Sequence, residues 1–306
     1  METIRVLQVD AFADEPLAGN PAGVVPDADG LTDDQMGAIA AEMAVSETAF
    51  LSSSDEADRR IRYFTPSKEV DLCGHATIAA YTHLHEEGLE AGTTTLEANV
   101  GVLEIEVEPD GTVWMEQDRP TVREVEVDYD RLAEGLGVDR GALEAMAADL
   151  PLAVASTGLA FLLVPVAYLS DLGGMEPDMA AIESLCGEVD ATGIYAFTFD
   201  TLEADSTAHG RMFAPAAGVP EDPVTGTASG ALGAYLRRFG ALETAEGETT
   251  ETGGETLCLE QGHYVDRPGY VRVRTDGAVR IGGRGVTALE GTLVVPEADG
   301  DDILEA

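Results

Sequence analysis

Two stretches of the chain carry residue types that could hold an anion beside a group that moves a proton. The first runs from Arg62 to Tyr81 and reads RYFTPSKEVDLCGHATIAAY. The second runs from Arg211 to Leu232 and reads RMFAPAAGVPEDPVTGTASGAL. In each, a strand-like run passes through an acidic turn and reaches a glycine that precedes an apolar, helix-like segment. A helix N-terminus presents unpaired N–H groups and the positive end of the helix dipole, so both stretches predict a site that suits a small carboxylate.

The two stretches correspond to each other along their length. The matched pairs are Arg62 with Arg211, Phe64 with Phe213, Pro66 with Pro215, Glu69 with Glu221, Asp71 with Asp222, and Gly74-His75-Ala76 with Gly226-Thr227-Ala228. Either stretch alone could be an ordinary capped helix after a turn. Two copies about half a chain apart indicate two related halves. If a pseudo-twofold axis relates the halves, both helix N-termini converge on one cleft, which could hold a carboxylate from both sides.

The charge of the chain is extreme. Its 306 residues include 58 acidic and 17 basic side chains, which gives a net charge of −41, and Lys68 is the only lysine. A nucleic-acid partner would need basic patches, which the sequence lacks. Such a charge causes strong self-repulsion, which dissolved salt would screen. In this respect the chain resembles the cytoplasmic proteins of organisms that keep molar salt inside their cells. The charge therefore indicates a habitat rather than a substrate.

Other global features favour a cytoplasmic protein of two domains. The hydrophobic fraction of 44% is enough to form buried cores. The sequence contains no run of 18 apolar residues, so no membrane span is predicted. The N-terminal METIRVLQVDAF enters a strand pattern directly and lacks the features of a signal peptide. The three cysteines, Cys73, Cys186 and Cys258, show neither a zinc spacing nor a disulfide framework, which is typical of a reducing compartment.

Hydrophobic periodicity predicts strands and helices in both halves. The predicted strands are 4–10, 23–25, 48–52, 60–64, 94–98, 101–107, 112–117, 153–156, 160–166, 193–200, 208–213, 256–261, 270–274, 278–282 and 291–296. The predicted helices are 31–43, 77–84, 129–136, 140–146, 175–185 and 231–238, of which 77–84 is expected to be amphipathic. Arg119-Pro120 marks the crossover to a second domain, 242–254 reads as an acidic surface loop, and 297–306 reads as a frayed tail.

Five segments together resemble the phenazine-biosynthesis isomerase family, the PhzF-like proteins. They are DAFADEPLAGNPAGVV, SETAFL, RYFTPSKEVDLCGHATIAA, GRMFAPAAGVPEDPVTGTASGAL and GYVRVRTDGAVRIGG. The resemblance implies an α+β fold of the diaminopimelate epimerase type, with two pseudo-twofold-related domains, each a mostly antiparallel sheet wrapped around a central helix. The halves would be 1–118 and 119–286, with a strand at about 287–300 returning to the first half and the active site in the cleft between them. It also implies a homodimer.

The resemblance further implies the residues that carry the chemistry. Glu47, in Ser46-Glu47-Thr48, matches the family's catalytic acid/base. A lone carboxylate can take a proton from one carbon and return it to another if burial raises its pKa, and the apolar neighbours of Glu47 suggest such burial. Its alternative role is a surface glutamate at a strand edge.

Other matched positions would bind or polarise the substrate. His75 and Asp222 match the family's active-site histidine and aspartate, and Thr227 stands where the family has a serine or threonine. Gly74 and Gly226 would offer backbone N–H groups to a carboxylate. Asp222 could instead be a turn residue before a proline, and Thr227 a helix cap, and both roles are compatible with substrate binding.

Cys73-Gly74 resembles the first cysteine of diaminopimelate epimerases and proline racemases, which use two opposed thiols. The second half offers Ser229-Gly230 where a second Cys-Gly would be expected, and a serine hydroxyl is far too weak an acid to replace a thiol. Two-thiol racemisation is therefore not expected, and Cys73 is interpreted as a small residue at the substrate site. Cys73 and His75 are two residues apart at a helix start, so we expect them not to face each other.

We expect no metal and no nucleotide cofactor. His83 and His85 lack a third ligand in sequence, and Gly282-Gly283-Arg284-Gly285 lacks the strand–helix context of a dinucleotide loop. The leading hypothesis is a cofactor-independent isomerase that moves a proton within a small cyclic or amino-acid-like carboxylate through Glu47. The alternatives are an amino-acid racemase or epimerase that uses Cys73, and a metabolite-binding protein without turnover.

Overall fold

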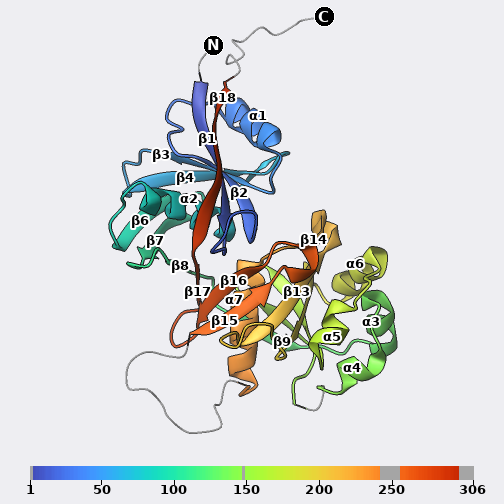
Figure 1. Cartoon of the computed structure of the whole chain (residues 1–306). Helices are drawn as coiled ribbons and strands as arrows, with labels where there is room; N and C mark the ends of the chain where they lie inside the picture. The colour runs from blue at the N-terminus through green and yellow to red at the C-terminus, as the bar shows by residue number, and fades with distance from the viewer. Residues whose placement is uncertain (1–2, 147–148, 242–255, 296–306) are drawn as a thin grey trace, which may run out of the picture. The chain divides into compact units, whose positions relative to one another are not determined.

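The computed structural model describes residues 3–146, 149–241 and 256–295, which fold as two compact units (Figure 1). Unit 1 comprises Met1–Leu17, Pro21–Val113 and Arg284–Ala306, and unit 2 comprises Ala18–Asn20 and Trp114–Gly283. None of the helices seen in the described ranges combines the length and the apolar character that crossing a bilayer requires. The loop predicted at 242–254 and the tail predicted at 297–306 lie outside the described residues, as do Pro296 and the end of the strand predicted to about 300.

Unit 1 is built on a sheet in the order β18–β1–β2–β3–β4–β6–β7, with the short β5 paired to β4. Its strands are β1 (Thr3–Ala11), β2 (Asn20–Val25), β3 (Thr48–Ser52), β4 (Arg59–Phe64), β5 (Glu69–Val70), β6 (Gly92–Ala98), β7 (Gly101–Val107) and β18 (Gly285–Val294). The pairs β2–β3 and β4–β6 are parallel, whereas β1–β18, β3–β4 and β6–β7 are antiparallel. The last strand, β18, thus lies beside the first, with Thr3 opposite Val294.

Unit 2 is built on a sheet in the order β9–β10–β11–β12–β13–β15–β16–β17–β8, with β14 paired to β13. Its strands are β8 (Val113–Glu116), β9 (Thr121–Glu124), β10 (Ala153–Ser156), β11 (Ala160–Pro165), β12 (Gly193–Thr198), β13 (Ala208–Ala214), β14 (Val219–Asp222), β15 (Leu257–Gln261), β16 (Gly269–Arg274) and β17 (Arg280–Gly283). The pairs β11–β12 and β13–β15 are parallel. The antiparallel pairs are β9–β10, β10–β11, β12–β13, β13–β14, β15–β16 and β16–β17.

The two sheets repeat one sequence of connections. In unit 1, β2 pairs in parallel with β3, which pairs antiparallel with β4. β4 takes the short β5, and a helix then leads to β6, which returns parallel to β4. In unit 2, β11, β12, β13, β14 and β15 repeat each of these steps in the same order and direction. The topology therefore confirms the duplication that the matched stretches predict.

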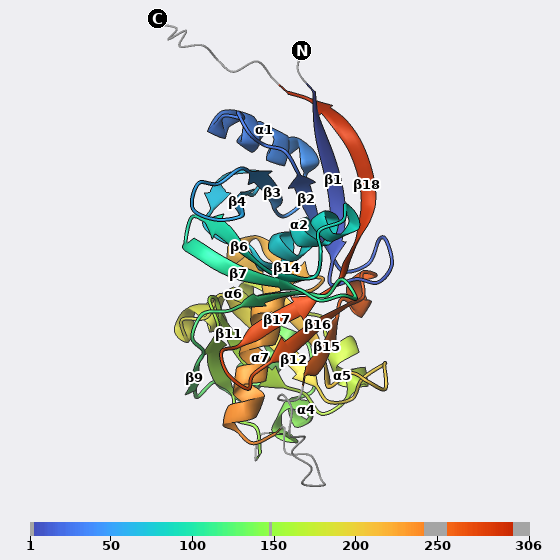
Figure 2. The same ribbon diagram turned by 90° about the vertical axis from the view of Figure 1, so that its left-hand side faces the viewer.

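Each unit has one helix that is buried almost all round. These helices are α2 (Gly74–Glu86) and α7 (Gly226–Arg238), and strands of the same unit surround each of them (Figures 1 and 2). In α2 every residue from Ala76 to Leu84 is buried, so the expected amphipathic character is wrong. A helix that meets a sheet on several sides must be apolar or small all round, which explains the run of alanine, threonine and glycine in both helices.

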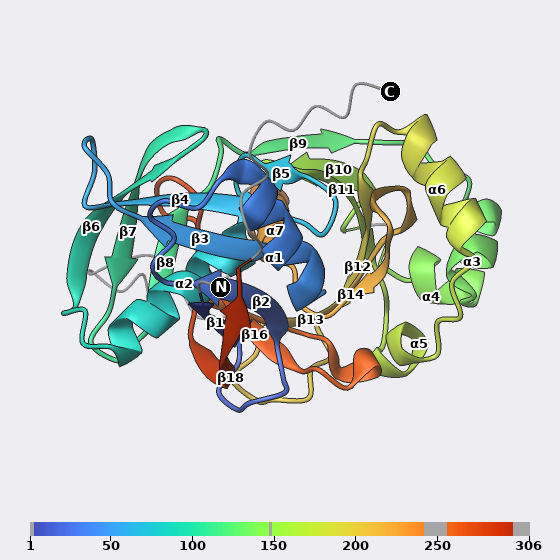
Figure 3. The ribbon, with the colours of Figure 1, turned by 90° about the horizontal axis from the view of Figure 1, so that it is seen from above.

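The other helices cover outer faces. They are α1 (Asp33–Met43) in unit 1, and α3 (Tyr129–Leu136), α4 (Arg140–Glu144), α5 (Leu169–Gly173) and α6 (Met179–Glu188) in unit 2. Figure 3 shows α3, α4, α5 and α6 grouped on one side of the sheet of unit 2, and their apolar residues form one core cluster with β10 to β13. The prediction of one helix over 175–185 is wrong in its bounds. Asp178 caps α6 by accepting hydrogen bonds from the backbone N–H groups of Ala180 and Ala181, so the helix starts later.

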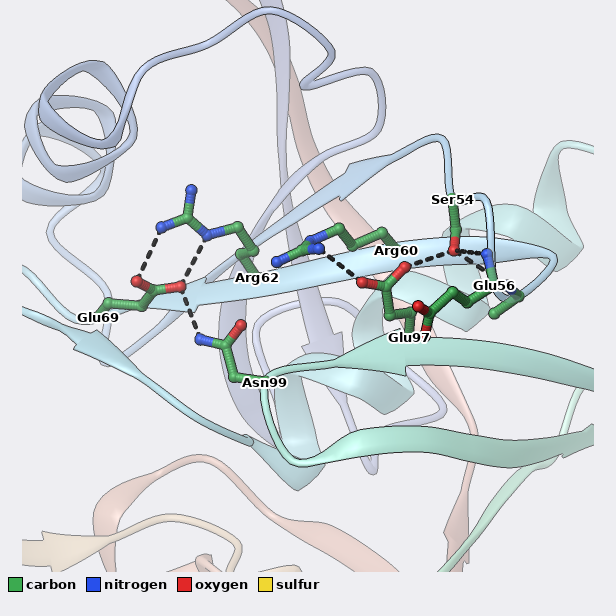
Figure 4. Close-up of polar contacts among 8 residues, drawn as sticks. Ser54, Glu56, Arg60, Arg62, Glu69, Glu97 and Asn99 are labelled. Carbon is green, nitrogen blue, oxygen red and sulfur yellow. Dashed lines mark hydrogen bonds and ion pairs between the residues drawn. The ribbon is translucent and has the colours of Figure 1, made fainter.

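A matched pair of ion pairs holds the turn that precedes each central helix. The guanidinium of Arg62 donates to both carboxylate oxygens of Glu69 at 2.7 and 2.8 Å (Figure 4), and Arg211 donates to both oxygens of Glu221 at 2.8 Å. Each guanidinium also lies over the phenylalanine two residues on, at 5.2 Å in unit 1 and 5.0 Å in unit 2. This equivalence confirms the match of Glu69 with Glu221. We call these two pairs the Arg–Glu clamps.

Candidate active site

The position of Glu47 is fixed by the backbone on both sides. Helix α1 ends at Met43, and its C-cap residue Ala44 has a left-handed conformation (φ 53°) that turns the chain toward β3. The N–H of Gly23 donates to the carbonyl oxygen of Glu47 at 2.9 Å. A Cβ atom at Gly23 would lie 2.4 Å from Oγ1 of Thr48, so only glycine lets β2 approach β3 this closely. The backbone that bears the Glu47 side chain is thus held in place at the start of β3.

His75 and Cys73 lie at the start of α2. Cys73 is the N-cap residue in an extended conformation, and His75 is in the first turn. The carbonyl oxygen of Cys73 accepts from the N–H of Thr77 at 3.0 Å and from its hydroxyl at 2.7 Å. The phenol of Tyr63 is hydrogen-bonded to the same hydroxyl at 2.6 Å, so a buried network fixes this helix start.

The imidazole of His75 lies between a carboxylate and a thiol. Its Nε2 is 3.5 Å from Oε2 of Glu47 and 3.2 Å from Oγ of Ser46, and its Nδ1 is 3.4 Å from Sγ of Cys73. The side chains of His75 and Glu47 are 13% and 23% exposed, so both are accessible to a small molecule. Because an imidazole has two distinct nitrogens, each able to donate or accept a hydrogen bond, this arrangement can exchange protons with either neighbour.

Two expectations about these residues need correction. Cys73 and His75 were expected not to face each other, but their Sγ and Nδ1 atoms are in contact, because the extended N-cap residue directs its side chain along the first turn. The expected burial of Glu47 is only partial, since the preceding Ala44 is exposed and the carboxylate remains open. Ser46 was not expected to take part, although it stands directly beside Glu47.

The second helix start carries different side chains. The N-cap of α7 is Thr225, so Thr225 takes the place of Cys73, and Thr227 takes the place of His75. The expectation that Ser229 stands where a second thiol would be is therefore wrong, because Ser229 lies farther inside the helix and is fully buried. Thr227 is not the helix cap either. The N-cap of α7 therefore carries a threonine hydroxyl where the N-cap of α2 carries a thiol.

Asp222 is held by a network that sequence reasoning missed. Its Oδ2 accepts from the hydroxyl of Thr225 at 2.5 Å, and its Oδ1 accepts from Nδ2 of Asn20 at 3.0 Å. Asn20 also donates to the carbonyl of Val224, and the amide of Gln261 donates to the backbone oxygen of Asp222 at 2.8 Å. The only sequence signal for Asn20 is its place in a Gly-Asn-Pro turn, which predicts a turn and no distant partner.

The predicted site residues therefore fall into two groups. Glu47, Cys73, Gly74 and His75 come together in unit 1, with direct contacts from His75 to Glu47 and Cys73. Asp222, Gly226 and Thr227 stand at the start of α7 in unit 2. In the described residues, the set Glu47, Cys73 and His75 is the one group of three whose ligand atoms could hold a metal ion, all within 4.8 Å of one another.

Comparison with known proteins identifies the class. The chain is 37% identical over 303 residues to an isomerase of Bacillus subtilis named "Uncharacterized isomerase YfhB", covering 97% of this chain and 98% of that protein. A PhzF-family structure from Bacillus anthracis superposes with a TM-score of 0.85 at 35% identity, covering 96% and 100%. A Pseudomonas aeruginosa structure titled a predicted epimerase gives a TM-score of 0.74 at 29% identity, covering 96% and 100%. The chain is an isomerase, and the α+β fold expected from the resemblance is confirmed.

The family follows from a match over most of the sequence. The model of the PhzC-PhzF family, described as phenazine biosynthesis-like protein, matches residues 9–291. The chain belongs to this family.

Proposed function

We propose that this isomerase moves a proton within a small carboxylate-bearing metabolite, cyclic or amino-acid-like, with Glu47 as the group that carries the proton. The observation that carries the proposal is the contact between Oε2 of Glu47 and Nε2 of His75 at 3.5 Å, beside the N-terminus of α2. A partly exposed carboxylate next to an imidazole is suited to general acid–base chemistry. The proposed proton transfers use groups of the protein and need no cofactor.

The reaction would proceed in two proton transfers. The carboxylate of Glu47 takes a proton from a substrate carbon, so that the C–H bond breaks, an O–H bond forms, and the electron pair enters the conjugated system of the substrate. The same carboxyl group then returns its proton to a different carbon, which restores the carboxylate and leaves an isomer without net oxidation. The N–H groups of the first turn of α2, which include those of Gly74 and His75, suit the substrate carboxylate.

Unit 2 is proposed to contribute to substrate binding. Asp222 is oriented by Asn20 and Thr225, and its carboxylate would pair with a cationic or hydrogen-bond donor group. Gly226 and Thr227 lie in the first turn of α7, where backbone N–H groups suit an anion. These roles rest on the family resemblance and on the helix-start geometry of each unit.

One observation favours a second candidate function, racemisation or epimerisation of an amino acid with Cys73 as a base. The contact of 3.4 Å between Sγ of Cys73 and Nδ1 of His75 gives the thiol a proton acceptor. Thr225 stands in the equivalent position of unit 2 and is no substitute for a second thiol. The single-carboxylate mechanism therefore accounts for more of the geometry.

Proton exchange in deuterated, high-salt buffer separates these functions. A panel of small cyclic and amino-acid carboxylates would be incubated with the wild type, Glu47→Gln and Cys73→Ala, and with Glu42→Gln as a control for loss of an exposed glutamate. Deuterium uptake followed by NMR that is lost in Glu47→Gln and kept in Glu42→Gln supports the proposal. Uptake that survives Glu47→Gln but is lost in Cys73→Ala overturns it in favour of the racemase. Binding of a panel member without any uptake would instead indicate a binding protein.

A further inference from the structure

We propose that Glu47, Cys73 and His75 form a binding site for one thiophilic divalent cation, with Zn²⁺ as the preferred ion, and that the bound ion blocks the enzyme. The binding part stands on the geometry of the three side chains alone. The blocking part rests on the proposed function, because an ion ligated by Glu47 occupies the group that would carry the proton. The site carries a thiol, an imidazole and a carboxylate, all within 4.8 Å of one another.

Two separations between ligand atoms match those around a tetrahedral ion, each measured at a different nitrogen of His75. Zinc lies at about 2.3 Å from a thiolate sulfur and about 2.0–2.2 Å from nitrogen or carboxylate oxygen, which separates sulfur from nitrogen by about 3.5 Å and nitrogen from oxygen by about 3.4 Å. The observed separations are 3.4 Å from Sγ of Cys73 to Nδ1 of His75, and 3.5 Å from Oε2 of Glu47 to Nε2 of His75. One ion binds one ring nitrogen, so the proposed site requires the Glu47 side chain to turn toward the nitrogen that holds the ion; all the ligand atoms already lie within 4.8 Å of one another.

The ligand set selects against the hard cations that an acidic protein attracts. The chain has 58 acidic residues, yet the described ranges hold no other group of three candidate ligands. Sodium, potassium and magnesium prefer oxygen ligands, whereas a thiolate with an imidazole favours zinc and similar ions. A thiolate and a carboxylate also neutralise the two charges of the ion. Binding at this site is therefore expected to persist in molar KCl, which screens the rest of the surface.

Two of the three ligands are held in place, and the site is open. The Thr77 hydrogen bonds fix the backbone of Cys73, and the helical first turn fixes His75. All three residues are partly exposed, so a dissolved ion can reach them. Three protein ligands with a fourth position open to water are the arrangement of reactive rather than structural zinc sites.

Cobalt(II) provides a direct test, because a thiolate–cobalt bond absorbs in the near ultraviolet. The wild type would be titrated with Co²⁺ in 2 M KCl, and then with Zn²⁺ to displace it. We expect one equivalent of Co²⁺, loss of the thiolate band in Cys73→Ser, and at least about tenfold weaker binding in Glu47→Gln and His75→Gln, as expected when one of three ligands is removed. The matched controls, Cys258→Ser, Glu42→Gln and His85→Gln, should bind Co²⁺ as the wild type does.

The outcomes separate binding from blocking. The proposed metal site is refuted if the thiolate–cobalt band persists in Cys73→Ser. It is also refuted if folded wild type shows no such band. Proton exchange by the wild type should fall with Zn²⁺ occupancy and return with EDTA. Exchange that continues at full occupancy overturns the blocking role but leaves the site. If no exchange is found even without metal, the proposed function fails while the Co²⁺ titration still decides the site.

Discussion

The carboxylate oxygen Oε2 of Glu47 lies 3.5 Å from Nε2 of His75, although one residue precedes β3 and the other opens α2. Ser46 contacts the same nitrogen, and Cys73 contacts the other nitrogen of the ring. His75 is therefore the one side chain that touches each of the other three. Replacement of His75 should therefore remove a contact from each of Glu47, Ser46 and Cys73.

We expect His75→Gln to lower the rate of proton exchange by about 100-fold or more, because general acid–base groups and their partners contribute on this scale. The pH dependence of the remaining activity should also change, since glutamine does not titrate. His85→Gln, a half-buried histidine on the same helix, is the matched control. Equal rates and equal pH profiles for wild type and His75→Gln would remove His75 from the reaction.

Asp222→Asn tests the group in unit 2. The amide keeps the shape of the carboxylate but loses its charge and one acceptor, so the bond from Thr225 or Asn20 is weakened. We expect about 1 kcal/mol lower stability and a fall in exchange rate that exceeds what this loss of stability explains. Asp266→Asn, at an exposed position with φ 57° that suits asparagine, is the control for charge. An activity loss that stabilising salt fully restores would indicate a structural role alone.

Gly23→Ala should both destabilise unit 1 and impair the site. The added Cβ would lie 2.4 Å from Oγ1 of Thr48, and the shift needed to relieve this contact would move the carbonyl of Glu47. We expect a loss of about 2 kcal/mol, typical of overpacking. Thr48→Ala removes the hydroxyl that meets the new Cβ, so the double variant should recover part of this loss. Additive losses in a thermal or denaturant double-mutant cycle would contradict the steric explanation.

The two Arg–Glu clamps should differ in strength. The side chain of Arg211 is 7% exposed and also donates to the carbonyls of Leu172 and Met175, whereas Arg62 is 17% exposed. Lysine lacks the planar fork, so Arg211→Lys should cost about 3 kcal/mol, and Arg62→Lys about 1 kcal/mol. Chemical denaturation in constant salt measures both. The reverse order would show that burial does not decide the strength of these pairs.

His83 should make the protein less stable in mild acid. Burial, followed by the charge of Arg5, lowers the pKa of His83, while Glu86, Glu87 and Glu290 oppose this shift. A histidine with a lowered pKa binds protons more readily when unfolded, so its contribution to stability is complete above about pH 6.5 and is lost as the pH falls through the folded-state pKa.

The variant His83→Gln should therefore show a smaller loss of unfolding free energy between pH 7.5 and 5.5. The difference can reach about 1.4 kcal/mol per pH unit for one proton. Burial, together with the charge of His209, also lowers the pKa of His263, so part of the acid dependence should remain until His263→Gln is added. Identical pH dependence in wild type and His83→Gln would contradict this assignment.

Local patterns predicted most elements, and the misses have physical causes. The alternation in β1 and the apolar run of β3 are local signals, and both strands were predicted closely. The starts of α2 and α7 were predicted too late, because neither Cys73 nor Thr225 accepts a capping hydrogen bond from its helix. Thr225 instead donates its hydroxyl to Asp222.

Candidate site residues could be named from the sequence only where they matched a family motif. Glu47, His75 and Cys73 carry such matches, but their mutual contacts depend on where β3 enters the sheet and on the extended backbone of an N-cap residue. The bond from Asn20 to Asp222 joins positions 202 residues apart, and no periodicity or spacing indicates it. Long-range polar contacts of this kind arise from tertiary packing and leave no local pattern.

The duplicated helix starts have an evolutionary consequence. Both copies keep the same Arg–Glu clamp, but the clamp stands apart from the residues that open the helix, which are Cys73-Gly74-His75 in one copy and Thr225-Gly226-Thr227 in the other. Selection for a stable frame therefore does not constrain those openings. One copy can keep a thiol and an imidazole at its helix start while its counterpart changes in size and polarity, so the two helix starts can diverge without loss of the frame that holds them.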